Sequence, residues 1–274
     1  MGENPCLKCY FDWKDFCDDS KRKACTEIYE NTKGHIKHIA SVSFGKDSLA
    51  MLLILISKGY PLDEVVFYDT GMEFQAIYDT RDMVIPILSN KGIKYTELQP
   101  KESFLYKMFE KPVCKKGTKT IHKYGYSWCG GTCRWGTTEK LQALEKHSKG
   151  AVEYIGIAAD EVSRLEKERK GNKVFPLADW GMAERDCRKY CYKKGFKWLE
   201  DGIELYSILS RVSCWCCGNK NLKELKLIHK HLPKYWNKLK ELQSKTVRPM
   251  KGEGKSVFAL ERRFDAEMEV GNEN

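Results

Sequence analysis

The sequence lacks any apolar run long enough to cross a bilayer. Its longest uninterrupted apolar segment, Leu49–Ile56, has eight residues, whereas a membrane-spanning helix needs about 20. The N-terminus lacks the charged and apolar regions of a signal peptide, and internal repeats and low-complexity tracts are missing. We therefore expect a cytoplasmic protein without membrane partners. Its 42% hydrophobic content is enough for a folded core, which argues against wholesale disorder.

Cysteine, by contrast, is plentiful, with 12 cysteines among 274 residues. Secreted disulfide scaffolds are usually smaller and poorer in Lys and Glu. In a chain expected to be cytosolic, this number of cysteines indicates metal, cluster or thiol chemistry.

Positive charge is concentrated near the C-terminus. Residues 211–263 hold 14 basic and 4 acidic residues, a net charge of +10 that equals the excess of the whole chain. Aromatic residues are interleaved there: Trp215, Tyr235, Trp236 and Phe258. Such a stretch suits a polyanion, so we expect a nucleic-acid partner. The alternative is a solvated, Lys-rich helix face.

Short apolar runs alternate with helical patterns between residues 36 and 158. Strands are predicted at 36–43, 64–68, 93–98 and 152–158, and helices at 48–57, 74–90, 102–110 and 137–147. Residues 111–135 are predicted to form a long functional loop, and three more helices are expected at about 181–194, 219–231 and 233–244. This alternation predicts an α/β fold: a Rossmann-like, doubly wound, mostly parallel sheet. We expect a Cys-rich N-terminal arm (1–35), a nucleotide-binding domain (36–185) and a helical, basic C-terminal region (186–274).

The segment from Ser41 to Ser48 is predicted to contain the end of a strand, a short loop and the start of a helix. A helix N-terminus offers unpaired N–H groups and partial positive charge to an anion. Gly45 allows close approach of the backbone, and Lys46 adds a point charge. Asp47 is expected either to cap the helix or to help hold Mg²⁺. The spacing is not that of a Walker A loop, yet the segment still predicts a phosphate site.

SFGKDS (residues 43–48) resembles the SGGKDS loop of the ATP-pyrophosphatase (PP-loop, adenine nucleotide alpha hydrolase) superfamily. Three further segments resemble the phosphoadenosine-phosphosulfate (PAPS) reductase-like branch of that superfamily. They are Tyr68-Asp-Thr-Gly-Met-Glu73, Gly156-Ile-Ala-Ala-Asp-Glu161 with Arg164, and Phe175-Pro-Leu-Ala-Asp-Trp180. These segments follow the family's order over roughly residues 38–220.

The resemblance implies a site for ATP and Mg²⁺ at the carboxyl ends of the strands. By that resemblance the nucleotide-binding residues are Ser41, Ser43, Phe44, Gly45, Lys46, Asp47, Ser48, Asp69, Thr70, Gly71, Gly156, Asp160, Glu161 and Arg164. One departure is Ala158, where the family often has Arg; Arg164 is the candidate substitute for that anion contact. We expect Lys46 and Asp47 to act in catalysis.

Two cysteine segments precede predicted helices, Cys129-Gly-Gly-Thr-Cys133 and Cys214-Trp-Cys-Cys217. Four thiolates can ligate a 4Fe-4S cluster or a tetrahedral zinc ion. By resemblance to assimilatory APS reductases we expect a 4Fe-4S cluster on Cys129, Cys133, Cys214 and Cys217, with structural zinc or no metal as alternatives. Cys216 is then a spare thiol, a replacement for Cys217, or a catalytic persulfide carrier.

The remaining cysteines fall into two further groups. Cys6, Cys9, Cys17 and Cys25 lie within 20 residues of the arm and form a candidate second zinc site, with redox or free thiols as the alternative. His35 and His38 are candidate extra ligands, although both are expected at the surface. Cys187 and Cys191 lie at helical spacing, and burial is the favoured interpretation of that pair.

The resemblance implies a two-step reaction: ATP adenylylates a substrate with release of pyrophosphate, and sulfur then displaces AMP. The favoured acceptor is nucleic acid, as in tRNA thiolation or DNA phosphorothioation, with a sulfur-donor protein such as a cysteine desulfurase as a partner. A homodimer is compatible with this scheme. The alternative is a sulfonucleotide reductase that releases sulfite, although the chain has no cysteine after Cys217 and keeps an ATP-splitting form of the loop. A non-catalytic nucleotide-binding module is the third candidate.

Overall fold

The computed structural model describes residues 36–129, 131, 133–168 and 172–272, together with Lys23 and Glu27. The cysteines of the predicted N-terminal arm lie outside these residues. The chain divides into two compact units. The first unit comprises the described residues up to Tyr68, Ile77–Leu98 and Gln142–Lys197; the second comprises Asp69–Ala76, Gln99–Leu141 and the residues from Trp198 onward.

The first unit is built on a parallel sheet with the strand order β3-β2-β1-β6-β7. Its strands are β1 (His38–Ser41), β2 (Glu64–Tyr68), β3 (Lys94–Leu98), β6 (Val152–Ile155) and β7 (Lys173–Val174). β1 lies between β2 and β6, with Ala40 opposite Val65 on one side and Tyr154 on the other. After Glu64, β2 consists of β-branched and aromatic residues, and all five of its residues are buried, so this strand forms part of the core. The predicted Rossmann-like parallel sheet is confirmed.

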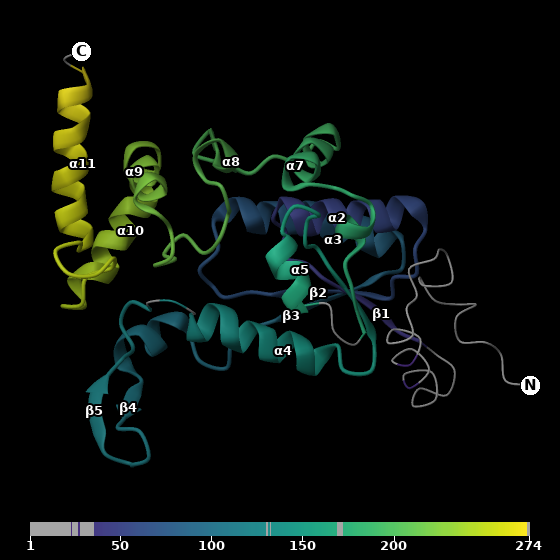
Figure 1. Ribbon diagram of the computed structural model, residues 1–274, viewed down its shortest axis with the longest axis horizontal. Coiled ribbons are helices and arrows are strands. Elements are labelled where there is room, and N and C mark those ends of the chain that lie inside the picture. Colours follow the sequence, from purple (N-terminus) through teal and green to yellow (C-terminus); the bar gives the residue numbers. More distant parts are fainter. Residues whose placement is uncertain are drawn as a thin grey trace, which may run out of the picture. The chain divides into compact units, whose positions relative to one another are not determined.

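Helices cover both faces of this sheet. Figure 1 shows α2 (Lys46–Lys58) and α3 (Gln75–Asn90) on one side and α4 (Glu139–His147) on the other. Leu144 of α4 packs against Ile39 and Val66 of the strands. α2 is apolar around most of its surface, as expected for a buried helix, and it ends at Gly59, whose φ of +69° suits glycine. The first unit also contains α5 (Val162–Glu168), α6 (Pro176–Asp179) and α7 (Glu184–Lys193).

The second unit combines helices with two short antiparallel pairs of strands. Its helices are α8 (Leu205–Ile208), α9 (Leu222–His231), α10 (Pro233–Ser244) and α11 (Val257–Asn272), with π-helices η3 (Tyr106–Glu110) and η4 (Arg134–Thr138). The strand pairs are β4 (Pro112–Cys114) with β5 (Ile121–Tyr124) and β8 (Leu199–Glu200) with β9 (Ile203–Glu204). The segment predicted as a loop over 111–135 therefore contains a β-hairpin. No helix in the described part of the chain is both long and apolar enough to cross a membrane.

Candidate functional site

The phosphate-loop candidate joins the end of β1 to the start of α2. Its Phe44 has a φ of +56°, an unusual backbone conformation for a residue other than glycine. Packing holds it there, because the Phe44 ring is fully buried and meets the Phe67 ring edge-on, with a centroid separation of 5.2 Å. Phe44 thus serves as a core anchor that fixes the shape of the loop.

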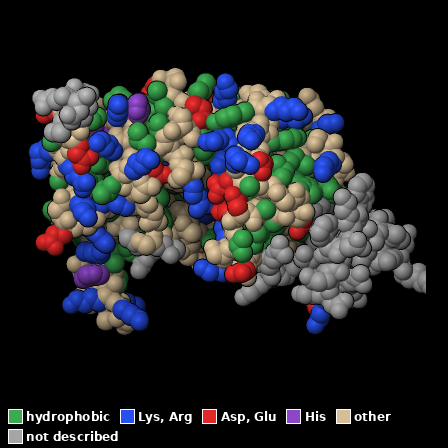
Figure 2. Space-filling model, turned by 45° about the horizontal axis from the view of Figure 1, so that its top comes forward, with side chains coloured by type: hydrophobic (Ala, Val, Ile, Leu, Met, Phe, Trp, Pro, Cys, Tyr) green, Lys and Arg blue, Asp and Glu red, His purple; other side chains and the backbone are tan. Residues whose placement is uncertain are grey.

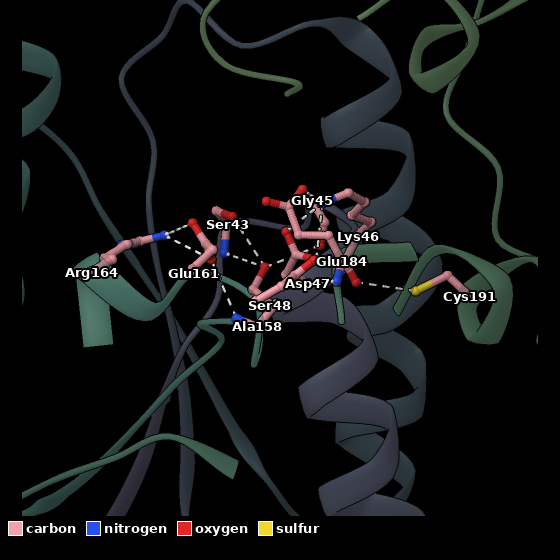
Figure 3. Close-up of polar contacts among 11 residues, drawn as sticks. Ser43, Gly45, Lys46, Asp47, Ser48, Ala158, Glu161, Arg164, Glu184 and Cys191 are labelled. Carbon is pink, nitrogen blue, oxygen red and sulfur yellow. Dashed lines mark hydrogen bonds and ion pairs between the residues drawn. The ribbon is translucent and has the colours of Figure 1, made fainter. Parts of the chain in front are cut away.

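Two serines link the ends of this loop (Figure 3). The Ser43 backbone N–H donates to Ser48 Oγ over 3.1 Å, and the two hydroxyl oxygens lie 3.1 Å apart. Gly156, after β6, lies against the same turn: a Cβ atom there would come within 2.7 Å of Ser48 Cα. Any larger residue at 156 would push the backbone away, so this predicted site residue has a steric role in the loop.

Lys46 begins α2 and is almost completely buried, at 6% exposure. Its Nζ atom lies 2.8 Å from Asp47 Oδ2 and 2.5 Å from Glu184 Oε2. Burial lowers the pKa of Lys46, but the two carboxylates outweigh that effect and the pKa is raised. Lys46 is therefore a fixed cation, and the expectation that Asp47 caps α2 is not met, because no side chain caps this helix.

Glu184 is a site residue that the sequence motifs did not reveal. It comes from the start of α7, a helix that packs against α2, and in Figure 3 its carboxylate faces Lys46. Asp160 fixes the start of that helix, since its Oδ1 accepts a hydrogen bond of 3.0 Å from the Glu184 backbone N–H. The sequence feature that could have revealed Glu184 is an acidic residue in the first turn of a helix, shortly after the Pro176–Asp179 segment.

Further carboxylates surround Asp47. Burial raises the pKa of Asp47, and the neighbouring Glu184 and Glu161 carboxylates add to the increase, against the opposing effect of Lys46. Glu161 accepts a 3.3 Å hydrogen bond from the Ala158 backbone N–H and pairs with Arg164 at 3.2 Å. Arg164, the candidate substitute for an arginine at 158, is thus already paired with Glu161.

Cys187 and Cys191 are both fully buried on α7, which confirms the interpretation of that pair. The Cys191 thiol donates to the carbonyl oxygen of Lys46 over 3.3 Å. Burial raises the pKa of Cys191 to about 12, so this thiol remains protonated and acts as a packing and hydrogen-bonding group beneath the loop.

The remaining predicted nucleotide-binding residues have other partners. Ser41 donates to Glu153 Oε1 of the neighbouring strand over 2.5 Å. Asp69, Thr70 and Gly71 belong to the second unit, where Asp69 Oδ1 accepts a 2.8 Å hydrogen bond from the Gly71 N–H. The Thr70 hydroxyl donates to Glu73 over 3.0 Å and lies 3.4 Å from the sulfur of Cys214.

Cys214 and Cys217 lie in one tight turn, closed by a 3.0 Å hydrogen bond from the Cys217 N–H to the Cys214 carbonyl. The turn is anchored by the Trp215 N–H, which donates to the Met72 carbonyl over 3.0 Å. Burial raises the pKa values of the Cys214 and Cys216 thiols. Beside them, the ammonium of Lys220 is also buried, and burial lowers its pKa.

The backbone brings the two predicted cysteine segments together. A Cβ atom on Gly218 would lie 3.0 Å from the Cys129 carbonyl oxygen, and the Asn219 side chain donates to the Gly131 carbonyl over 3.0 Å. The Cys133 sulfur accepts a 3.2 Å hydrogen bond from the Gly136 N–H within η4. Among the described residues, no three Cys, His or acidic side chains gather around one point. Cysteine thiolates are suitable metal ligands, and the two segments approach each other closely, so these residues fit a thiolate-bound metal. The sulfur atoms of the four cysteines do not themselves surround one point among the described residues.

The second candidate zinc site, on Cys6, Cys9, Cys17 and Cys25, lies outside the described residues, as does His35. His38 lies within β1 and is 1% exposed, so the expectation of a surface histidine was wrong. Its ring stacks on Tyr154 with a centroid separation of 5.9 Å. A histidine whose ring faces the core in this way is a structural residue.

The basic stretch 211–263 is largely engaged within the second unit. Lys226 pairs with Glu267 and Lys240 with Glu261, each at 2.8 Å, and Lys238 lies over the rings of Trp215 and Tyr235. Trp215, Tyr235 and Trp236 are buried. Three of its four aromatic residues thus belong to the core of the unit.

Comparison with known proteins agrees with this arrangement. Residues 37–200 match the family described as the phosphoadenosine phosphosulfate reductase domain. The chain belongs to the PAPS reductase family. The matched residues contain the whole parallel sheet, the phosphate loop and Glu184.

Two relatives come from Methanocaldococcus jannaschii. The chain is 27% identical over 241 residues to uncharacterized protein MJ0066, covering 81% of this chain and 44% of that protein. It is 28% identical over 241 residues to uncharacterized protein MJ0973, covering 82% and 53%, respectively. The chain thus spans about half the length of the curated relatives it matches.

Among solved structures, the chain is similar to the U34-tRNA thiolase NcsA from Methanococcus maripaludis with its 4Fe-4S cluster. The match has a TM-score of 0.40 and 14% identity, and covers 90% of this chain and 78% of that one.

Proposed function

We propose that this PAPS reductase-family protein splits ATP into AMP and pyrophosphate to adenylylate a nucleic-acid substrate for sulfur transfer. The observation that carries the proposal is Lys46, buried and charged at the N-terminus of α2 between Asp47 and Glu184. A fixed cation at a helix N-terminus is the arrangement that stabilises the charge developing on a leaving pyrophosphate.

The residues of the loop fit a triphosphate. The hydroxyls of Ser43 and Ser48 and the N–H groups at the start of α2 are donors, and Gly156 leaves the backbone of the loop unobstructed. Mg²⁺ prefers carboxylate oxygens, and Asp47, with Glu161 nearby, provides that donor type. Bound Mg²⁺ would neutralise phosphate charge, while Lys46 would stay in place through Glu184.

The reaction has two balanced steps. In the first, an oxygen of the acceptor attacks the α-phosphorus of ATP, the bond to the bridging oxygen breaks, and pyrophosphate leaves. In the second, a sulfur nucleophile at the hydrosulfide level attacks the activated carbon, and the carbon–oxygen bond breaks to release AMP. The acceptor oxygen therefore departs within AMP, and sulfur takes its place.

The cysteines of the second unit would supply the sulfur chemistry. Cys129, Cys133, Cys214 and Cys217 would hold a 4Fe-4S cluster, with zinc as the alternative occupant, and Cys216 is the candidate persulfide carrier. A cluster at this position would supply a binding point for sulfur. Cys216 would be protected from water by its burial, at 3% exposure. A cysteine desulfurase is the proposed sulfur donor. Its persulfide sulfur would reach the hydrosulfide level by taking two electrons from a thiol reductant, which leaves as a disulfide.

The first experiment measures the products of ATP. The purified protein is incubated anaerobically with ATP, Mg²⁺ and RNA or DNA, and AMP and pyrophosphate are quantified. Equal amounts of the two products are expected. ADP with phosphate as the products would contradict the proposal, and thiol-dependent sulfite release from PAPS or APS would favour a sulfonucleotide reductase.

The matching variant is Lys46→Ala, which removes the buried cation. AMP formation should fall by about a hundredfold or more, because loss of one electrostatic donor to a developing charge costs roughly that much. Lys58→Ala, at the far end of the same helix, is the control and should retain the wild-type rate. Full activity of Lys46→Ala would place the reaction elsewhere.

A further inference from the structure

The β4–β5 hairpin carries charge of only one sign. Residues 111–138 contain five lysines, one arginine and no Asp or Glu. On the hairpin, Lys115, Lys116, Lys119 and Lys123 are all exposed, and no ion pair joins them to an acidic side chain in the described part of the chain. Figure 2 shows blue side chains, which in this segment are lysines, on the hairpin at the lower left of the view. Four unneutralised cations on one short ribbon form a surface for a polyanion.

The hairpin has a defined shape. Its tip is closed by a 2.9 Å hydrogen bond from the Lys115 N–H to the Thr120 carbonyl and a 3.0 Å bond from the Thr118 N–H to the Lys115 carbonyl. At its base, Gly125 has a φ of +66°, and a Cβ atom there would lie 2.3 Å from the Met108 carbonyl oxygen. The lysines are therefore presented on an ordered ribbon anchored to the body of the second unit.

The hairpin also exposes an aromatic ring. Tyr124 is 66% exposed and Ile121 is 45% exposed, whereas Trp215, Tyr235 and Trp236 of the basic stretch 211–263 are buried. An exposed ring beside cations can stack on an unpaired base. Paired and stacked bases offer no such face, which favours a nucleic acid with unstacked loop bases.

We propose that the β4–β5 hairpin is the binding surface for a folded RNA with unpaired loop bases. Lys115, Lys116, Lys119 and Lys123 contact its phosphates, and Tyr124 stacks on a base. This inference deepens the proposed function and rests on it for one point, that the bound RNA is the sulfur acceptor. Binding itself requires neither ATP nor sulfur.

The test compares two fourfold variants with the same loss of charge. In the hairpin variant, Lys115, Lys116, Lys119 and Lys123 are changed to Gln. In the control variant, the exposed lysines Lys91, Lys149, Lys189 and Lys193 of the first unit are changed to Gln. Binding of a fluorescein-labelled RNA stem-loop is measured by anisotropy, without ATP, at several salt concentrations.

The hairpin variant should bind at least about thirtyfold more weakly than the control variant, which corresponds to the loss of two or more phosphate contacts. At 0.15 M salt each phosphate contact corresponds to roughly a fivefold factor in affinity, and its loss makes the salt dependence less steep by about 0.7–0.9. Equal affinity and equal salt slopes for the two variants would overturn the proposal. A fourfold Lys→Arg variant of the hairpin should bind like wild type, which separates loss of charge from loss of folding.

The aromatic contact has its own test. Tyr124→Ser should weaken binding of the stem-loop about tenfold, within the range for loss of one stacked base. The same variant should bind a fully paired RNA duplex as the wild type does. Tyr124→Phe keeps the ring and should bind the stem-loop like wild type. Tighter binding of a DNA stem-loop of the same sequence would overturn the choice of RNA. Because AMP formation is assayed separately, the two proposals fail separately: wild-type affinity in the hairpin variant would contradict only the hairpin proposal, and absence of AMP from the wild-type protein would contradict only the proposed function.

Discussion

The reactive groups of the two units lie in different electrostatic environments. In the first unit, the cation of Lys46 is neutralised within the protein by two carboxylates. In the second, half-buried Cys214 and buried Cys216 have raised pKa values, and a buried lysine, Lys220, lies near them. The phosphate-loop candidate is preorganised, whereas burial keeps the Cys214 and Cys216 thiols protonated in spite of the nearby lysine.

This contrast indicates two kinds of ligand. A site that already balances its charges can exchange carboxylate for phosphate at low cost, because its geometry is fixed in advance. Buried thiols become thiolates when a metal compensates the charge. The comparison therefore predicts that damage to one unit leaves the ligand of the other unit in place.

The largest effect is expected at the turn that contains Cys214 and Cys217, and it concerns the bound metal. Cys214→Ala should abolish bound metal, measured as iron or zinc content and as visible absorbance, because it removes one of four proposed ligands. ATP binding by this variant should be unchanged. Cys216→Ala should retain the metal, as should the control Cys114→Ala, an exposed thiol on the hairpin. Full metal content in Cys214→Ala would rule out the proposed quartet.

A smaller effect is expected at Glu184, which positions Lys46. Glu184→Gln should lower kcat/KM for AMP formation by about ten- to a hundredfold, because a displaced catalytic group costs roughly that much. It should also move the acid limb of the pH profile downward, since the Glu184 charge helps to raise the pKa of Asp47. Glu184→Asp should restore part of the rate. An unmoved acid limb would show that Glu184 has no electrostatic role.

The smallest effect on activity concerns the framework of the first unit, where a variant changes stability and not catalysis. Burial opposes ionisation of Glu64, but hydrogen bonds from Lys37, Thr96 and His147 outweigh it and lower its pKa to about 2. Such a carboxylate stabilises the fold above its unfolded pKa of about 4.5, and that stability is lost as the pH falls toward 2.

Glu64→Gln should therefore lower the free energy of unfolding at pH 7 by about 3 kcal/mol, at roughly 1.4 kcal/mol per pKa unit. The difference from wild type, measured by urea denaturation, should shrink between about pH 4.5 and 2. The surface variant Glu145→Gln is the control and should change little. A difference that persists undiminished at low pH would assign the loss to packing and not to charge.

Local patterns in the sequence were sufficient for much of the first unit. The helix expected at 48–57 is α2, the strand 64–68 is β2, and the paired cysteines 187 and 191 are buried as expected. These features depend on periodicity and on apolar runs of neighbouring residues. Glu184 could not be predicted as a partner of Lys46, because their contact joins residues far apart in the sequence.

The second unit was harder to predict. The hairpin within 111–135 has little apolar alternation and a turn of Lys, Gly and Thr, so its sequence lacks the usual strand signal. The aromatic residues of 211–263 look like an interface in the sequence, yet Trp215, Tyr235 and Trp236 pack inside. Burial of an aromatic residue is decided by the tertiary packing of α9, α10 and α11, which local sequence does not contain.

The central claim, adenylyl transfer at the phosphate loop, has one direct test. An RNA acceptor labelled with heavy oxygen at its base carbonyls is incubated with the protein, ATP, Mg²⁺ and sulfide, and the AMP produced is analysed by mass spectrometry. Attack of the acceptor oxygen on the α-phosphorus predicts AMP that carries the heavy oxygen, together with unlabelled pyrophosphate. AMP whose new oxygen comes only from water, or ADP in place of AMP, would contradict the account.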